Sequence, residues 1–201
     1  MLIKNKPMNT TSWIVRDPQI STRGAKSCQI EHAKPEPGSD SRIRINVGSK
    51  EHPSKTPFGA TTYDGAESSQ KTIEFNISDT EVENFNTIVS WLAAYLASHS
   101  ERIFKKSMTL DQVMESIKSP VTQRDGYQPH LRCKIRPSNV RVWNEDGRVR
   151  EGGLPADLRP YKLVPRVVIE KLWIMSRECG LVLQVTDLLI LEQEADTCPF
   201  F

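Results

Sequence analysis

A run of alternating basic and apolar residues from His130 to Arg136 is the part of the sequence best suited to chemistry. Alternate side chains of a strand point to opposite faces, so Arg132, Lys134 and Arg136 would form a row on one face, about 7 Å apart. That spacing is close to the phosphate spacing of an extended single strand, and cations are the groups that bind phosphates. The run therefore predicts a surface for an extended polyanion, and the alternative is a solvated strand face without a ligand.

Aromatic and basic residues flank this run. Tyr127 precedes it, and Arg141 and Trp143 follow it. Rings stack on unpaired bases while cations hold the backbone, so this interleaving favours single-stranded nucleic acid. The alternative is that Trp143 is a core residue, because aromatic side chains are more often packed than functional.

A second basic-aromatic patch contains Arg102, Phe104 and Lys105, between two expected helices. We interpret it as a further contact to nucleic acid. Its alternative role is local, because basic residues near the end of a helix also pair with the helix dipole.

The last ten residues, 192–201, carry three acidic residues and no basic ones before a terminal Pro199, Phe200 and Phe201. This composition predicts a flexible acidic tail whose aromatic tip docks on a partner protein. Two alternatives remain open: the tail occupies the chain's own nucleic-acid groove, or it is a frayed end.

Sequence motifs for catalysis are missing: the sequence has no phosphate-binding loop, dinucleotide-binding glycine pattern, nucleophile elbow or H-E-x-x-H zinc motif. Cys28 with His32, and His130 with Cys133, each offer two metal ligands, which is fewer than a zinc site requires. We therefore expect no catalytic residue, no metal and no cofactor. The four cysteines lie far apart, so reduced thiols are expected.

The distribution of charge is more informative than the net charge of +2. Residues 102–177 carry 16 Lys and Arg against 8 Asp and Glu, whereas residues 178–201 carry 5 acidic residues and no basic ones. A basic block before an acidic tail suits a polyanion partner. No apolar run approaches the roughly 18 residues that span a bilayer, and the N-terminus lacks a secretory core, so an intracellular protein without membrane association is expected.

Periodicity predicts strands on either side of two helices. Apolar residues recur every three or four positions within 79–98, and the capping box at Thr109 and Gln112 begins a second helix over 109–119. Strands are expected over 42–47, 71–77, 130–136, 139–143, 163–175 and 181–190, with a hairpin turn at 144–147 and a turn at Gly180.

This order predicts a mainly β, α+β fold: an OB-like five-stranded barrel with a two-helix insertion in mid-chain. Residues 42–191 would form this domain. Residues 1–41 would be a partly ordered N-terminal arm with one strand near 12–15, and residues 192–201 the tail.

Residues 60–201 also resemble a known family. The similarity rests on Thr62-Tyr63-Asp64-Gly65, the amphipathic helix, segment 100–106, the basic run, Val140 to Trp143 with its turn, the Leu-rich strands and the final Cys198-Pro-Phe-Phe201. In this order they resemble the OB-fold single-stranded DNA-binding proteins of nucleocytoplasmic large DNA viruses, which are distantly similar to those of tailed phages.

This resemblance implies a non-enzymatic protein that coats exposed DNA during replication, recombination or repair, in a viral replication compartment of the host cytoplasm or nucleus. It also implies that the tail recruits replication proteins. The tail's three acidic residues are fewer than in bacterial and phage relatives, which weakens the idea that it competes with DNA. Homo-oligomerisation is left open. Two other classes remain: a protein-interaction adaptor that binds no nucleic acid, and a small metal-dependent nuclease.

Overall fold

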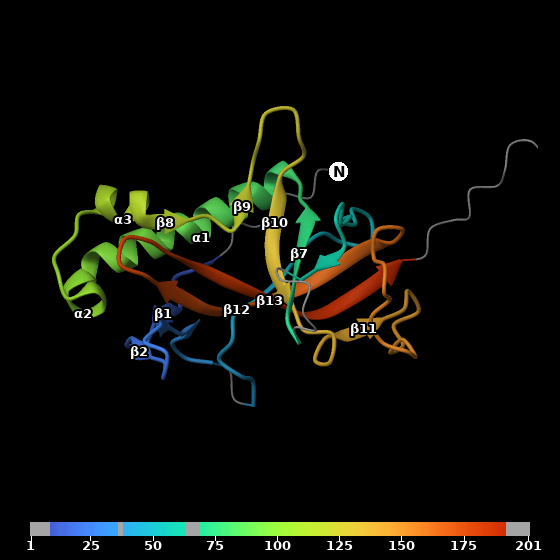
Figure 1. Cartoon of the computed structure of the whole chain (residues 1–201), viewed down its shortest axis with the longest axis horizontal. Helices are drawn as coiled ribbons and strands as arrows, with labels where there is room; N and C mark the ends of the chain where they lie inside the picture. Colours follow the sequence, from blue (N-terminus) through green and yellow to red (C-terminus); the bar gives the residue numbers. More distant parts are fainter. Residues whose placement is uncertain (1–8, 36–37, 63–68, 192–201) are drawn as a thin grey trace, which may run out of the picture. The chain divides into compact units, whose positions relative to one another are not determined.

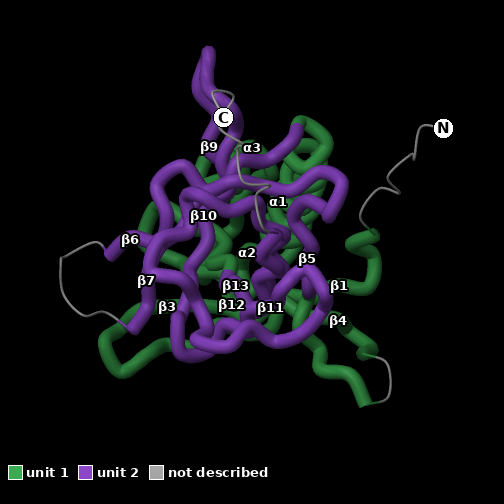
Figure 2. The backbone as a smooth tube through the Cα atoms, turned by 90° about the vertical axis from the view of Figure 1, so that its right-hand side faces the viewer, with its two compact units in different colours: residues 1–43, 79–121, 169–183 green, residues 44–78, 122–168, 184–201 purple. Residues whose placement is uncertain are grey.

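The computed structural model describes residues 9–35, 38–62 and 69–191. Within them the chain forms two compact units (Figure 2). Unit 1 comprises residues 1–43, 79–121 and 169–183, and unit 2 comprises residues 44–78, 122–168 and 184–201. The long strands β12 (Lys162–Ile174) and β13 (Cys179–Leu191) each contribute to both units (Figure 1).

Unit 1 contains the helices. They are α1 (Asp79–Ser98), α2 (Ser100–Phe104) and α3 (Leu110–Ser116). Its short strands are β1 (Trp13–Val15), β2 (Gln19–Ile20), β3 (Lys26–Cys28), β4 (Ile30–His32) and β8 (Ile117–Lys118). Strand β1 pairs with β4, β3 lies between β2 and β12, and β8 runs parallel to β13.

Helix α1 has the bounds that its three- and four-residue spacing predicts. The residues buried along one face are Val82, Phe85, Ile88, Leu92, Ala93 and Leu96. The ring of Trp91 packs edge-on against Trp13 of β1 at 5.4 Å, and the Tyr95 hydroxyl donates to the Val15 carbonyl oxygen. Residues 13–32 therefore supply four short strands and part of the unit 1 core, whereas the sequence predicted one strand within the arm 1–41.

The second expected helix is shorter than predicted. The Thr109 and Gln112 capping box is present, but α3 ends at Ser116 and the chain continues as β8. Leu110 and Met114 of its expected apolar stripe are largely exposed. The segment between the predicted helices is itself helical, as α2, with Ile103 fully buried. The sequence did not predict α2 because a five-residue helix is too short to show periodicity.

Unit 2 contains β5 (Arg44–Asn46), β6 (Ala60–Thr61), β7 (Lys71–Asn76), β10 (His130–Ile135) and β11 (Arg141–Trp143). Strand β7 pairs antiparallel with both β6 and β10, whereas β10 and β11 run parallel to β13. Strand β5 pairs antiparallel with β12. Strand β9 (Val121–Thr122) pairs with β10.

The strands form a mixed sheet beside helices, so the α+β prediction is confirmed. Among the described residues, the path of paired strands has two ends, β2 and β6, and does not close into a barrel. The five-stranded barrel is therefore not confirmed. Side chains on both faces of β13 are buried, which explains its nearly continuous apolar sequence.

Two turns show how local sequence acts. At 144–147 the Gly147 N–H donates to the Asn144 carbonyl oxygen, with Gly147 at φ +82°, as the hairpin prediction requires. Gly180 is not a turn residue as predicted, because the turn lies at 175–178 and Gly180 is inside β13. A Cβ on Gly180 would lie 2.9 Å from Trp173 Cζ2, so close packing explains this glycine.

Three cysteines lie in the described residues, and all three are buried free thiols: Cys28 and Cys179 in unit 1, and Cys133 in unit 2. Burial raises the pKa of the Cys28 thiol to about 11. Burial also raises the pKa values of Cys133 and Cys179 above the usual thiol value. Since the thiolate is the reactive form, these thiols are poor nucleophiles at neutral pH.

Candidate nucleic-acid interface

The pairing of β7 with β10 creates two different sides. Leu131, Cys133 and Ile135 of β10 are buried on one side. The other side carries three cross-strand pairs, which are His130 with Asn76, Arg132 with Glu74, and Lys134 with Thr72. We call the row His130, Arg132 and Lys134, of which Arg132 is exposed and the other two are half-buried, the basic side of β10.

Arg132 and Lys134 lie close enough to influence one another. The Lys134 ammonium donates a hydrogen bond of 2.8 Å to the Thr72 hydroxyl. Partial burial lowers the pKa of Lys134, and the positive charge of Arg132 lowers it further. Arg132 itself is exposed. Two like charges held side by side attract an anion that can contact both.

Arg136 does not continue this row. Strand β10 ends at Ile135, and the Arg136 carbonyl oxygen accepts hydrogen bonds from the N–H groups of Asn139 and Val140. The residue therefore begins a turn and is half-buried. The expected row of three cations is shortened to two by this early strand end, which alternation in the sequence did not reveal.

A second cluster joins β11 to β13 around Asp187. Arg141 forms an ion pair of 2.8 Å with the Asp187 carboxylate, and Trp143 Nε1 donates to the same oxygen at 3.2 Å. The Arg141 guanidinium carbon lies 5.8 Å from the centre of the Trp143 ring. Trp143 is half-buried and Asp187 is only 7% exposed, so the cluster holds the indole in a fixed place at the surface.

Tyr127 lies in the loop 123–129, which joins β9 to β10 and projects from unit 2 in both views (Figures 1 and 2). Its N–H donates to the Arg124 carbonyl oxygen, with Gly126 between them at φ +77°. The side chain is 72% exposed, so its ring is accessible for stacking.

Arg102, Phe104 and Lys105 belong to unit 1, whereas the predicted site residues between 127 and 143 belong to unit 2. The Arg102 guanidinium donates to Asp17, to the Val15 carbonyl oxygen and to the Tyr95 hydroxyl, which ties α2 to the N-terminal segment. Phe104 is half-buried, and Lys105 is exposed with φ +62° at the end of α2. Only Lys105 of the three presents an uncommitted side chain to solvent within the described residues.

Sequence reasoning missed two residues of unit 2. The signal for Asp187 was an acidic residue within an apolar strand, because a buried carboxylate requires hydrogen-bond or ion-pair partners. Phe58 follows Pro57 in a long loop, and no periodic pattern marked it. Its ring is 61% exposed and packs edge-on against His130 at 6.3 Å.

Pro199, Phe200 and Phe201 lie outside the described residues, as do Tyr63 and Cys198. Over the described ranges, no group of three or more His, Cys, Asp or Glu residues is arranged to hold a metal ion. None of the helices in that part of the chain is long and apolar enough to cross a membrane.

No known family model matches the sequence, and no curated protein matches it either. A solved structure does: gp2.5, a single-stranded DNA-binding protein encoded by bacteriophage T7, with a TM-score of 0.51 at 12% identity. The match covers 79% of this chain and 91% of the phage protein. At this identity the likeness is one of fold, and the type found in nucleocytoplasmic large DNA viruses is not shown by it. The chain is thus similar in fold to a phage single-stranded DNA-binding protein.

Proposed function

We propose that this chain binds single-stranded DNA with little sequence preference, using the basic side of β10 as its main contact. The observation that carries the proposal is the pair of cations Arg132 and Lys134 on one side of β10, two residues apart along the strand. Burial lowers the pKa of Lys134, and the charge of Arg132 lowers it further, so the two cations repel one another. A phosphate between them relieves that repulsion and gains two charge-assisted hydrogen bonds. The similarity in fold to the phage protein supports the same function.

The surrounding residues extend this contact. Arg136 and Arg141 supply further positive charge along the backbone of the strand, and Tyr127 offers an exposed ring for a base. Because Arg141 lies over the indole of Trp143, a base at that cluster rests against the guanidinium, whose plane stacks as a ring does. Arg102, Phe104 and Lys105 form a separate patch, to which Lys105 contributes most.

Unit 2 is the OB-like part in this proposal. In it, β5, β7 and β10 with the unit 2 parts of β12 and β13 would be the five strands of that fold, and unit 2 holds the short strands β6 and β11 in addition. An OB fold binds oligonucleotides across one strand face and the loops beside it. The basic side of β10 and the loop 123–129 correspond to such a surface.

The biological role follows from sequence-tolerant binding. A protein of this kind coats DNA exposed during replication, recombination or repair, and we propose that the 192–201 tail recruits partner proteins through Pro199, Phe200 and Phe201. Deleting residues 192–201 should leave binding to an oligonucleotide intact, since the three acidic residues repel DNA only weakly at physiological salt. A large loss of DNA affinity on deletion would contradict a partner-docking role for the tail.

The proposal is tested by fluorescence anisotropy with a labelled oligo-dT and a duplex of the same length. Tight binding to the single strand, with much weaker binding to the duplex, is expected. The double variant Arg132→Ala/Lys134→Ala should bind the single strand far less tightly.

The matched control is Lys171→Ala/Arg177→Ala, which removes the same charge from exposed residues of unit 1 and should bind like the parent chain. Equal losses in both double variants would mean that net charge alone drives binding. No binding of either DNA by the parent chain would exclude the proposal and favour the protein-interaction adaptor. Cleavage of end-labelled DNA with added Mg²⁺ would point to a nuclease instead.

A further inference from the structure

The loop that presents Phe58 is fixed to the body of unit 2 by backbone hydrogen bonds. Ser54 and Leu163 exchange both of their N–H to carbonyl bonds at 2.8 Å, and the Asn76 N–H donates to the Lys55 carbonyl oxygen. Thr56, two residues before Phe58, is 1% exposed. Phe58 is therefore exposed because a rigid backbone directs it outward.

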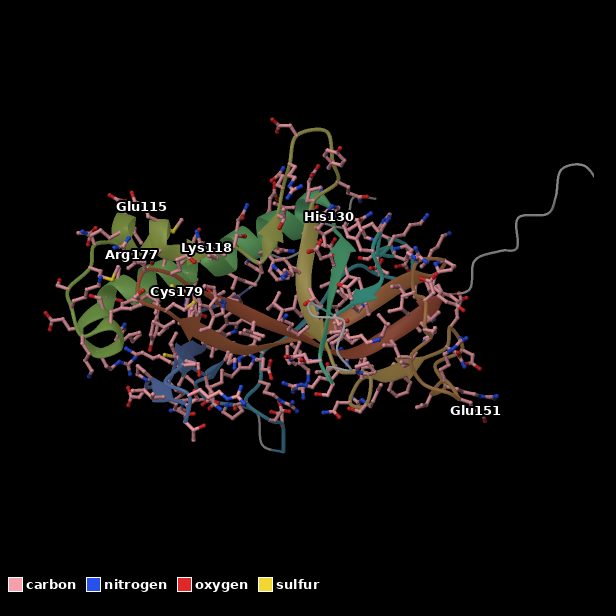
Figure 3. The ribbon with its side chains drawn as sticks, viewed as in Figure 1. Glu115, Lys118, His130, Glu151, Arg177 and Cys179 are labelled. Carbon is pink, nitrogen blue, oxygen red and sulfur yellow. The ribbon has the colours of Figure 1, made fainter. Side chains whose placement is uncertain are left out.

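The contact with His130 brings Phe58 to the basic side of β10. The two rings lie 6.3 Å apart at an interplanar angle of 81°. His130 begins β10, and Arg132 follows it on the same side, about 7 Å along the strand. Figure 3 labels His130 at this end of β10. An exposed aromatic ring thus lies at one end of the row that contains the two cations of the proposed function.

The geometry of this ring pair leaves Phe58 able to stack. With the two planes nearly perpendicular, His130 covers at most one face of the Phe58 ring, and the other face is left for a third group. A single exposed apolar side chain is common and needs no explanation by itself. Here the exposed ring also packs against a second ring at the end of a strand that carries two cations, and single strands are bound by such a combination of rings and cations.

We propose that Phe58 is a base-stacking residue of the single-stranded DNA interface, at the end of the basic side of β10 near the loop 123–129. This inference rests on the proposed function. In it, Arg132 and Lys134 hold the phosphates while Phe58 stacks on the adjacent base. Tyr127 precedes β10 by three residues. Bound DNA would therefore contact the rings of Phe58 and Tyr127 at one end of the basic side of β10 and the cations along it.

The test compares three substitutions at one position by anisotropy with oligo-dT. Phe58→Ala should lower the affinity about 5- to 150-fold, which corresponds to the loss of one stacked base. Phe58→Leu, which keeps apolar bulk without a ring, should lose nearly as much, whereas Phe58→Trp should retain the affinity. Met175→Ala, which truncates another exposed apolar side chain in unit 1, is the matched control and should bind normally.

The salt dependence of binding separates this inference from the proposed function. Stacking releases no counterions, so Phe58→Ala should keep the parent slope of log affinity against log salt, while Arg132→Ala reduces it by about 0.7.

If the parent chain binds and Arg132→Ala lowers the slope but Phe58→Ala binds normally, only the role of Phe58 is wrong. If Phe58→Leu binds as tightly as Phe58→Trp, the ring does not stack. If the parent chain does not bind at all, the proposed function itself fails. Urea unfolding of each variant checks that its fold is intact.

Discussion

Burial and a neighbouring cation both lower the pKa of the Lys134 side chain. Its pKa is lowered from the usual value of 10.5, with burial as the larger cause and Arg132 as the second. A bound phosphate favours the protonated form, so binding becomes weaker as the pH rises through this lowered pKa. Over the same pH range the folded state binds fewer protons than the unfolded state. The free energy of unfolding therefore increases as the pH rises. Weaker binding at high pH would therefore not be caused by unfolding.

The affinity of the parent chain for oligo-dT should therefore fall as the pH rises from neutral toward the usual lysine value of 10.5, because the pKa of Lys134 lies below that value. Lys134→Arg should remove most of that fall, because a guanidinium keeps its proton throughout this range. Anisotropy titrations at fixed ionic strength measure both. A parallel fall in the two proteins would show that Lys134 does not contact phosphate.

Asp187 is the residue on which the Arg141 and Trp143 cluster depends. Asp187→Ala leaves the Trp143 N–H without its acceptor, whereas the Thr186 hydroxyl keeps the Arg166 carbonyl oxygen, and we expect the substitution to lower the free energy of unfolding by about 1–3 kcal/mol. Asp187→Asn keeps an acceptor oxygen and should cost less. The ion pair with Arg141 adds little, because the Arg141 side chain is 63% exposed. Urea denaturation followed by tryptophan fluorescence would measure the difference, and equal stability of Asp187→Ala and the parent chain would contradict this account.

At the scale of the elements, alternation predicted which side of a strand is buried. Ile73 and Phe75 of β7, and Leu131 and Cys133 of β10, are buried as their period of two requires. The pairing of those strands was not predictable, because it joins residues far apart in the sequence. The same holds for Trp143 and Asp187, whose contact spans 44 residues. Only the register shows that Glu74 faces Arg132 and Thr72 faces Lys134.

Close packing between β8, β12 and β13 in unit 1 makes a prediction about Gly180. Its added Cβ would lie 2.9 Å from Trp173 Cζ2 and 3.0 Å from the Lys118 carbonyl oxygen. Gly180→Ala should therefore lower the free energy of unfolding by about 1–3 kcal/mol through overpacking. Urea unfolding measures the change, and a larger loss for Gly180→Val would support the steric cause. A stabilised Gly180→Ala protein would show that the strands separate readily.

At the scale of the whole molecule, the sequence predicted an α+β protein with a basic middle region but not its division into two units. Each unit is built from three separate stretches of chain, and β12 and β13 belong to both, so no composition boundary marks the division. The charged residues of the basic block are likewise shared between units. The residues of the candidate interface were predictable from the sequence. Strand pairing then showed that Arg132 and Lys134 share one side of β10, whereas Arg141 is paired with Asp187.

The central claim is that phosphates are bound by Arg132 and Lys134, and the slope of log affinity against log salt tests it most directly. Each phosphate contact to single-stranded DNA contributes about 0.7 to this slope. For oligo-dT, we expect a steep slope for the parent chain, a decrease of about 1.4 for Arg132→Ala/Lys134→Ala, and no change for Lys171→Ala/Arg177→Ala. An unchanged slope in the Arg132→Ala/Lys134→Ala variant would contradict it.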